Sequence, residues 1–364
     1  MAEIVIKNLR KEFGAFTAVK GSSFTIRDGE FFMLLGPSGC GKTTTLRMIA
    51  GLELPTSGEI LIDGEDVSQK PASQRDIAMV FQMFALYPHM NVRKNIAYPL
   101  VSQGVPKAEV QRKVTEVAKI LRINHLLDKG VSGLSGGDRQ RVALGRAIVR
   151  QPKAFMMDEP LGALDAEFRE IMAEELRALH DRMGATTVYV THDQLEAMQM
   201  GDKIVVMNHG VVEQFGTPQD IYDHPATLFV AEFIGSPSMN FLRFEGNVQA
   251  GAKAVALRET QIALPELHET ASGQLVLGVR PEHVVLSDTA QLRGRIEAVE
   301  YLGTTQIVTL STPHGIVKAR TSSAMPAKPG DLTGLALNAP RLSIFDANSG
   351  RALRTAANAG VHHG

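Results

Sequence analysis

The 364-residue chain has little of three things that many proteins use: cysteine, long apolar runs and an excess of charge of one sign. Its one cysteine, Cys40, cannot form a disulfide within the chain, which fits a reducing compartment. The longest apolar runs, at residues 31–35 and 204–207, are far shorter than the ~20 residues of a membrane-spanning helix. Residues 1–13 also lack the apolar core of a signal sequence. We therefore expect a protein that does not cross a membrane itself.

The charges are nearly balanced, with 38 basic and 39 acidic residues, and neither part of the chain is strongly basic. Proteins that bind nucleic acid by neutralising phosphates usually carry a basic patch or tail, so we expect no nucleic-acid partner. The chain is 44% hydrophobic, which is enough for a full-sized core and argues against disorder. Its length fits about two domains.

Strand and helix patterns alternate over the first 235 residues, which predicts an α/β domain with a parallel sheet. The expected strands are residues 4–6, 31–35, 154–157 and 186–190, and the expected helices are residues 43–50, 107–122, 137–150 and 166–183. Residues 202–215 predict two more strands, and residues 219–223 and 228–233 predict short helices.

A domain boundary is expected at Gly235, where glycine, serine and proline cluster, so the predicted domains are residues 1–235 and 236–364. Short β-type runs separated by glycine and proline predict a small β-barrel or sandwich in the second domain. These runs are residues 274–279, 283–286, 294–299, 305–310 and 315–319. We expect the last dozen residues to be frayed.

Residues 36–43, GPSGCGKT, match the phosphate-loop pattern G-x-x-x-x-G-K-[ST] between a predicted strand and a predicted helix. Glycines let the backbone curl so that N–H groups point at phosphate oxygens, and the helix start adds its positive end. Lys42 can reach the β- and γ-phosphates, and the Thr43 hydroxyl can bind Mg²⁺. We expect nucleotide contacts from Ser38, Gly39, Cys40, Gly41, Lys42, Thr43 and Thr44.

Cys40 lies near a helix N-terminus, a place that can lower the pKa of a thiol. We nevertheless interpret it as a small filler residue of the loop. Alkylation of Cys40 should block nucleotide binding for steric reasons.

Two acidic residues follow the apolar run at residues 154–157. Because the carboxyl ends of parallel strands meet at one edge of a sheet, Asp158 is expected beside the phosphate loop, where it can hold Mg²⁺. Glu159 is then a candidate general base that activates the attacking water. An alternative is that both residues are ordinary solvated acids at the end of a strand. The phosphate loop upstream favours the interpretation as a hydrolysis site.

A second anion-binding helix start is predicted at residues 134–141, LSGGDRQR. Ser135, Gly136 and Gly137 can contact phosphate there, but no second lysine–threonine set accompanies them. The simplest explanation is that two copies of the chain share each nucleotide. This predicts a two-fold homodimer with two composite sites.

With these motifs the sequence resembles the ATPase subunits of ATP-binding cassette (ABC) transporters. The resemblance covers nearly the whole chain and implies ATP and Mg²⁺ as ligands, with Lys42, Glu159 and His192 as catalytic residues. Phe13 would stack on adenine, Gln82 would contact ATP and Mg²⁺ together with Thr43 and Asp158, and His192 would contact the γ-phosphate. Asp165 would communicate across the dimer.

The chain departs from the family pattern at Asp138, Gly162 and Phe13, and we expect Asp138 to point away or to bond a backbone group.

The tail motifs QFGTP, FIGSPSMNF, GVRPEH and IFDANSG resemble bacterial importers of the maltose and glycerol-phosphate type. This likeness implies an α/β P-loop ABC ATPase domain with a helical subdomain, followed by an all-β OB-like (TOBE/MOBE-type) regulatory domain. It also implies two transmembrane permease subunits, an extracytoplasmic solute-binding protein and a peripheral place on the cytoplasmic face of the bacterial inner membrane. Residues 84–90 would help to form a groove for a short permease helix.

The expected function is ATP hydrolysis that powers import of a carbohydrate, polyol or sugar phosphate. Importers of sulfate, polyamine, iron or molybdate carry similar tails and remain an alternative. A soluble cassette ATPase of DNA repair or translation is disfavoured by the single cassette and the lack of a heptad run. A regulatory protein or ligand that binds the C-terminal barrel is compatible with transport.

Overall fold

The computed structural model describes residues 2–162, 164–258 and 260–360. These residues form two compact units that divide between Pro218 and Gln219. The division comes before Gly235, where the sequence predicts a boundary, because the two short helices that precede Gly235 pack with the second unit. Among the described residues, no helix is both long and apolar enough to cross a lipid bilayer.

A six-stranded sheet forms the centre of the first unit, in the order β10-β9-β3-β8-β7-β6. Five of its strands are parallel and only the edge strand β10 runs against its neighbour. The predicted parallel sheet is therefore confirmed. The strands are β3 (Phe31–Leu35), β6 (Ile77–Val80), β7 (Ala154–Asp158), β8 (Thr186–Thr191), β9 (Lys203–Asn208) and β10 (Val211–Gly216).

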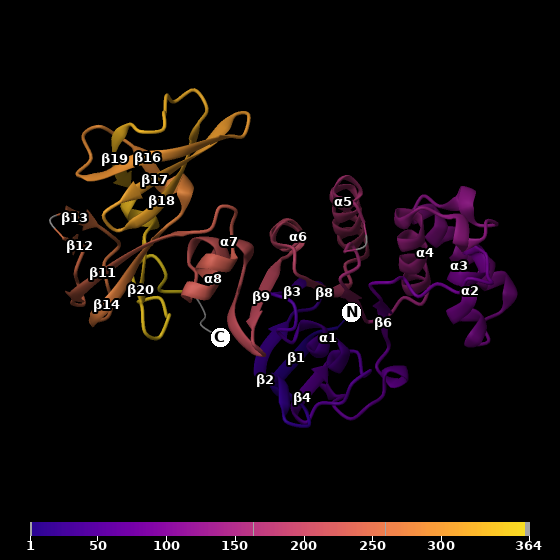
Figure 1. Ribbon diagram of the computed structural model, residues 1–364. Helices are drawn as coiled ribbons and strands as arrows, with labels where there is room; N and C mark the ends of the chain where they lie inside the picture. The colour runs from indigo at the N-terminus through magenta and orange to yellow at the C-terminus, as the bar shows by residue number, and fades with distance from the viewer. Residues whose placement is uncertain (1, 163, 259, 361–364) are drawn as a thin grey trace. The chain divides into compact units, whose positions relative to one another are not determined.

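One face of this sheet packs against helix α1 (Lys42–Ile49) and a second, antiparallel sheet, and the other face is covered by α5 (Ala166–Met183) and α6 (Gln194–Met200) (Figure 1). Side chains of β3 alternate between the two faces, as a strand requires. Phe32 and Leu34 belong to the core with α1, whereas Phe31 contacts His180 of α5. The antiparallel sheet is formed by β2 (Phe16–Ile26), β1 (Ile4–Phe13), β4 (Ser57–Ile62) and β5 (Glu65–Asp66), in that order.

Three helices between β6 and β7 form the helical part of this unit, beside α5 in Figure 1. They are α2 (Val92–Ser102), α3 (Lys107–Ile120) and α4 (Gly136–Ile148). Each pair of them is in contact, and their buried apolar side chains face one another. Short 3-10 helices occur in this unit at Ala72–Gln74, Asn124–Leu126 and Val131–Gly133.

The second unit begins with the helices α7 (Pro218–Asp223) and α8 (Leu228–Phe233) and continues as antiparallel β-structure. Arg280 holds the helices to the strands, because its guanidinium donates hydrogen bonds to the carbonyls of Tyr222, Ala231 and Ile234. This side chain is 1% exposed. Burial lowers the pKa of Arg280, and the carbonyl oxygens replace the water that its charge would otherwise bind.

Three groups of strands make up this all-β part, in the orders β11-β14-β20, β12-β13 and β15-β19-β16-β17-β18. Most of their buried apolar side chains form one core, and Val276 and Phe345 belong to a second, smaller cluster. The strands are β11 (Asn240–Val248), β12 (Ala254–Leu257), β13 (Thr260–Ala263), β14 (Ala271–Val279), β15 (Val284–Leu286), β16 (Leu292–Tyr301), β17 (Thr305–Thr312), β18 (Gly315–Ser322), β19 (Leu332–Leu337) and β20 (Ser343–Asp346). Two 3-10 helices lie at Pro281–His283 and Ala339–Arg341.

The expectation of a frayed end is wrong for the described residues of the last dozen. Leu353 and Thr355 are buried, and the Asn358 carboxamide oxygen accepts a hydrogen bond from the Thr355 N–H at 2.6 Å. Thr355 also pairs with Leu267 in an isolated β-bridge. Buried contacts and backbone pairing therefore hold this segment in place.

Candidate phosphate and hydrolysis site

The loop between β3 and α1 curls tightly, and glycine is required at two of its bends. A Cβ atom at Gly36 would lie 2.3 Å from the carbonyl oxygen of Met207, and one at Gly41 would lie 2.6 Å from that of Ala18. Gly41 also has a φ of 106°, which disfavours other residues. The loop can adopt this shape only with the glycines of the phosphate-loop pattern.

Lys42 begins α1 and folds back into the loop. Its Nζ donates hydrogen bonds to the carbonyls of Gly36 at 2.8 Å and Pro37 at 2.9 Å, and the residue is 4% exposed. A buried ammonium group needs such partners. Phosphate oxygens can replace these neutral carbonyls as acceptors, and the hydrogen bonds then join groups of opposite charge.

The start of α1 is open to an anion. Its cap residue Gly41 makes no side-chain hydrogen bond, and the first turn contains no acidic residue. The N–H groups of a first helical turn have no partner within the helix, and they carry the positive end of the helix dipole. The loop and the helix start together form a positively polarised cradle.

Thr43 and Asp158 meet across the sheet edge, where the Thr43 hydroxyl donates a hydrogen bond to Asp158 Oδ1 at 2.9 Å. Asp158 ends β7, and burial raises the pKa of its carboxyl group, against the hydrogen bond from Thr43. When phosphates supply some of its ligands, Mg²⁺ needs only a few ligands from the protein, such as a hydroxyl and one carboxylate. No cluster of three or more histidine, cysteine, aspartate or glutamate side chains that could hold a metal occurs in the described part of the chain. The residues present therefore fit a magnesium ion that is bound together with nucleotide.

The carboxylate of Glu159 lies between two other predicted site residues. Its Oε2 accepts a hydrogen bond from Gln82 Nε2 at 3.4 Å and lies 3.3 Å from Nδ1 of His192. Gln82, Glu159 and His192 follow the neighbouring parallel strands β6, β7 and β8, respectively. The carboxyl ends of these strands lie at one edge of the sheet and bring the three side chains together. Glu159 has a φ of 44°, and its N–H donates to the Val190 carbonyl at 3.0 Å. Gln82 contacts Glu159 rather than Thr43 or Asp158 in the described structure.

The serine–glycine motif opens α4 as predicted. Ser135 is the N-cap, and its Oγ accepts the N–H of Asp138 at 3.1 Å. The expected bond from Asp138 to a backbone group is wrong, because among the described residues its carboxylate bonds the side chains of Ser135 and Arg141. That Asp138 points away from a bound phosphate stays a prediction. Gly136 lies beside Leu164, in the segment that follows Glu159. Among the described residues, the motif makes no hydrogen bond to the phosphate loop of its own chain.

Three further predicted residues occupy distinct places. Phe13 ends β1 opposite Phe16, is 48% exposed and has Nζ of Lys11 4.8 Å from its ring centre. Asp165 caps α5 by accepting the N–H of Phe168 at 3.1 Å. Cys40 is buried in the loop, and burial raises the pKa of its thiol. This agrees with a filler role and not with an activated thiol.

Three family models match the chain. The model of the ABC transporter family matches residues 19–162, that of the MalK OB fold domain matches residues 235–284, and that of the TOBE domain matches residues 277–345. Curated relatives match over nearly the full length. They include the trehalose import ATP-binding protein SugC of Mycobacterium tuberculosis, 46% identical over 96% of this chain and 98% of its own. The chain belongs to the ABC transporter ATP-binding proteins.

Two other relatives of this ABC ATPase have names of the same kind. The sn-glycerol-3-phosphate import ATP-binding protein UgpC of Ruegeria sp. is 47% identical, over 96% of both chains. The lactose transport ATP-binding protein LacK of Rhizobium radiobacter is 46% identical, over 97% of this chain and all of its own.

Solved structures of ABC ATPases resemble the first unit. CbiO1 of Clostridium perfringens, part of the transporter complex cbiONQ, has a TM-score of 0.56 and 28% identity over 60% of this chain and 89% of its own. The cassette MJ0796, a dimeric post-hydrolysis state bound to ADP and phosphate, has a TM-score of 0.53 and 32% identity. It is matched over 59% of this chain and 98% of its own.

Sequence reasoning missed one residue of this ABC ATPase, Arg169 of α5. Its guanidinium donates to the Leu164 carbonyl at 3.1 Å and to Asp193 Oδ2 at 3.3 Å, and it lies 3.9 Å from Glu196. Arg169 thus joins the segment before Asp165 to the segment that carries His192. A lone arginine in an amphipathic helix gives no signal of such a role, because the partner segments lie elsewhere in the sequence.

A groove of about 330 Å³ lies beside β6 in the helical part of the ABC ATPase. Arg146 shapes it by donating to the carbonyls of Phe84 at 2.9 Å and Ala85 at 2.6 Å. Both acceptors have positive φ, which turns the chain along the groove. Tyr87 and Tyr98 form one wall, with ring centres 4.6 Å apart.

Proposed function

We propose that this ABC ATPase hydrolyses ATP to power import of a carbohydrate, polyol or sugar phosphate through a binding-protein-dependent transporter. The names of the relatives support this cargo class, since trehalose, lactose and sn-glycerol 3-phosphate all belong to it. The position of Glu159 between Gln82 and His192, beside the Thr43–Asp158 pair, carries the hydrolytic part of the proposal.

ATP binds with its phosphates in the loop and with adenine on the exposed face of Phe13. Lys42 and the backbone N–H groups of Ser38, Gly39, Cys40 and Gly41 hold the β- and γ-phosphates, and the first turn of α1, with Thr43 and Thr44, completes the cradle. Thr43, Asp158 and Gln82 are the residues that would hold Mg²⁺. The ion supplies a positive charge that offsets the charge developing on the phosphates.

Glu159 orients the attacking water and accepts its proton. The residue is well placed because the parallel strands direct it toward the loop and because Gln82 and His192 hold its carboxylate. His192 donates a hydrogen bond to the γ-phosphate. General-base assistance of this kind contributes roughly 10²- to 10⁴-fold to a rate.

Each site is completed by a second copy of the chain. Ser135, Gly136 and Gly137 form a helix start far in sequence from the phosphate loop, and among the described residues they make no hydrogen bond to that loop. They contact the γ-phosphate of the partner's ATP, and Asp165 conveys the state of one site to the other. The dimeric MJ0796 relative supports such a homodimer.

In each copy of the chain, the groove beside β6 receives a short helix from one of the two transmembrane permease subunits. Its aromatic wall and its position next to Gln82 couple permease movement to the hydrolysis site. The ATPase is then peripheral to the cytoplasmic face of the inner membrane, and an extracytoplasmic solute-binding protein delivers the cargo. The OB and TOBE domains provide a surface for a regulatory protein or ligand.

The test is affinity purification of the tagged protein from detergent-solubilised native membranes, with mass spectrometry of the associated chains. We expect two multi-span permeases and a binding protein, and ligand screening of that binding protein identifies the cargo. Tyr98→Glu, in the groove, should lose the permeases. Tyr301→Glu is the matched control, because Tyr301 is 74% exposed in the second unit. Association with ribosomal or DNA-repair proteins, without a permease, would overturn the proposal.

A further inference from the structure

The hydroxyl of Ser135 is already engaged within its own helix. Ser135 Oγ donates a hydrogen bond to Asp138 Oδ2 at 2.8 Å and accepts the N–H of Asp138 at 3.1 Å. The proton that would point at a phosphate oxygen therefore points at a carboxylate. A hydrogen bond to a charged acceptor is stronger than one to a neutral acceptor.

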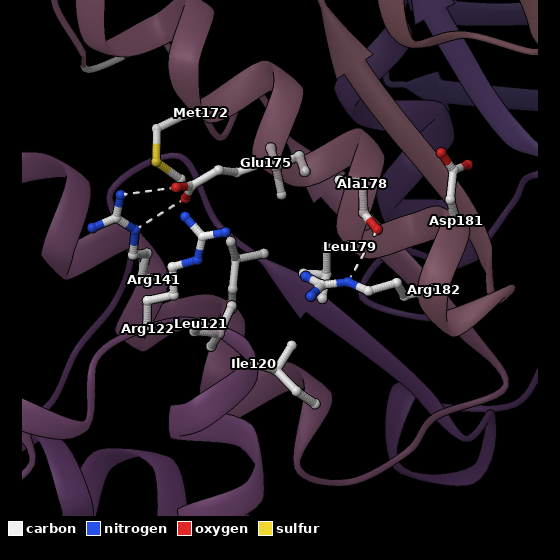
Figure 2. Close-up of a pocket in the computed structure, with 12 residues that line it drawn as sticks. Ile120, Leu121, Arg122, Arg141, Met172, Glu175, Ala178, Leu179, Asp181 and Arg182 are labelled. Atoms are coloured by element: carbon white, nitrogen blue, oxygen red, sulfur yellow. Dashed lines mark hydrogen bonds and ion pairs between the residues drawn. The ribbon is translucent and has the colours of Figure 1, made fainter.

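The negative charge of Asp138 is only partly neutralised. Arg141 Nη1 lies 3.2 Å from Asp138 Oδ1, but the same guanidinium also contacts Glu175 of α5, with Nε 3.1 Å from Oε2. Figure 2 shows the contacts between Arg141 and Glu175 at the edge of a cavity of about 360 Å³. One cation serves two carboxylates, so the group keeps a net negative charge.

The two phosphate-facing helix starts of the chain therefore differ. The first turn of α1 has no acidic residue and no side-chain cap, whereas α4 begins with a side-chain cap and an acid in its first turn. An anion that approaches α4 must compete with the Asp138 carboxylate for the Ser135 proton and must also overcome the repulsion of like charges.

We propose that Asp138 is a positioning residue that holds the Ser135 hydroxyl away from the partner's ATP and so raises the ATP concentration at which the dimer closes. Arg141 weakens this effect, and Glu175 strengthens it because Glu175 and Asp138 compete for the Arg141 guanidinium. The inference rests on the proposed composite site. It concerns only the γ-phosphate contact made across the dimer, and not nucleotide binding to the phosphate loop.

The experiment uses the full chain with Glu159→Gln, in which hydrolysis is suppressed, and measures the fraction of dimer against ATP concentration by light scattering. Asp138→Asn keeps a hydrogen-bond acceptor and removes the charge. We expect it to lower the half-maximal ATP concentration about fivefold, the ratio set by the difference between charged and neutral hydrogen bonds. Glu175→Gln should shift it in the same direction by less, and Arg141→Gln should raise it.

A purely structural role predicts the opposite sign, because loss of the acidic charge from the first turn weakens α4 and hence dimer closure. In the Asp138→Asn background, Arg141→Gln should have much less effect than in the parent. Affinity for ADP, which lacks the γ-phosphate, should be unchanged in every variant. If neither Asp138→Asn nor Glu175→Gln lowers the half-maximal ATP concentration, this inference is wrong, while the proposed composite site still stands. A parent that forms no ATP-dependent dimer would overturn the composite site as well.

Discussion

Glu159 Oε2 lies 3.3 Å from Nδ1 of His192, although 32 intervening residues, including the whole of α5, separate the two in the chain. The contact exists because β7 and β8 are adjacent parallel strands and both residues follow the carboxyl ends of these strands. The proposed base and the proposed γ-phosphate ligand are thereby held together at one edge of the sheet.

Replacing Glu159 by glutamine should separate ATP binding from hydrolysis. The amide has the size of the carboxylate but cannot accept the proton of water, so we expect kcat to fall at least 100-fold, the lower end for loss of a general base. ATP affinity should be retained, and an ATP-bound dimer should accumulate. Steady-state phosphate release and size-exclusion chromatography measure the two effects. Glu170→Gln is the control, since Glu170 is exposed on α5. Robust turnover in the Glu159 variant would remove Glu159 from the role of base.

Arg169 links two segments of the proposed site, and its loss should lower kcat more than ATP affinity. It holds the Leu164 carbonyl and Asp193, and among the described residues neither of these makes a hydrogen bond to the phosphate loop. We expect Arg169→Met to reduce kcat about tenfold with little change in KM. A double-mutant cycle with Asp193→Asn should give a loss smaller than the sum of the single losses. Fully additive effects would show that the contact does not couple the segments. Arg112→Met, on the exposed face of α3, is the matched control.

Cys40 should react slowly with thiol reagents at neutral pH. The residue is 3% exposed, and burial raises the pKa of its thiol above the ordinary value of 9.0, so little thiolate is present. Labelling should accelerate as the pH rises and should slow when ATP is bound. Mass spectrometry counts the label without ambiguity because the chain has one cysteine. Labelled protein should fail to bind ATP, since the adduct would fill the loop. Complete labelling with normal nucleotide binding would contradict this.

His180 should make stability depend on pH. Burial lowers the pKa of its imidazole below 6.5, with a further contribution from Arg177, and its Nδ1 lies 3.1 Å from Thr187 Oγ1. The unfolded chain therefore binds the proton more readily than the folded one. The stabilisation is present above the unfolded pKa and is lost as the pH falls toward the folded pKa.

We expect the melting temperature to drop by a few degrees more between pH 7.5 and 5.5 in the parent than in His180→Gln. Differential scanning calorimetry measures the difference, and the other histidines cancel in the comparison. His125→Gln, at an exposed position, should behave like the parent. Equal slopes in the parent and His180→Gln would contradict the prediction.

Local patterns in the sequence predicted much of the first unit. The five apolar residues of β3 and the eighteen-residue amphipathic helix α5 have the expected bounds. The first antiparallel sheet was largely missed, because strands such as β4 are short, half-exposed and paired with distant segments. The all-β character of the second unit was also predicted. The buried Arg280 was not assigned a structural role, because its carbonyl partners come from two helices at a distance in sequence.

The sequence alone determined the chemistry of the phosphate loop, because the glycine spacing and the lysine–threonine pair act within a few consecutive residues. It also determined the family, through motifs that lie in a particular order. Only the tertiary structure decided which residues meet. The strand order β3-β8-β7-β6 places Gln82 and His192 on either side of Glu159, and α5 brings Glu175 to the Asp138–Arg141 pair. These contacts depend on hydrogen bonding and packing between segments far apart in the chain, which local residue patterns do not encode.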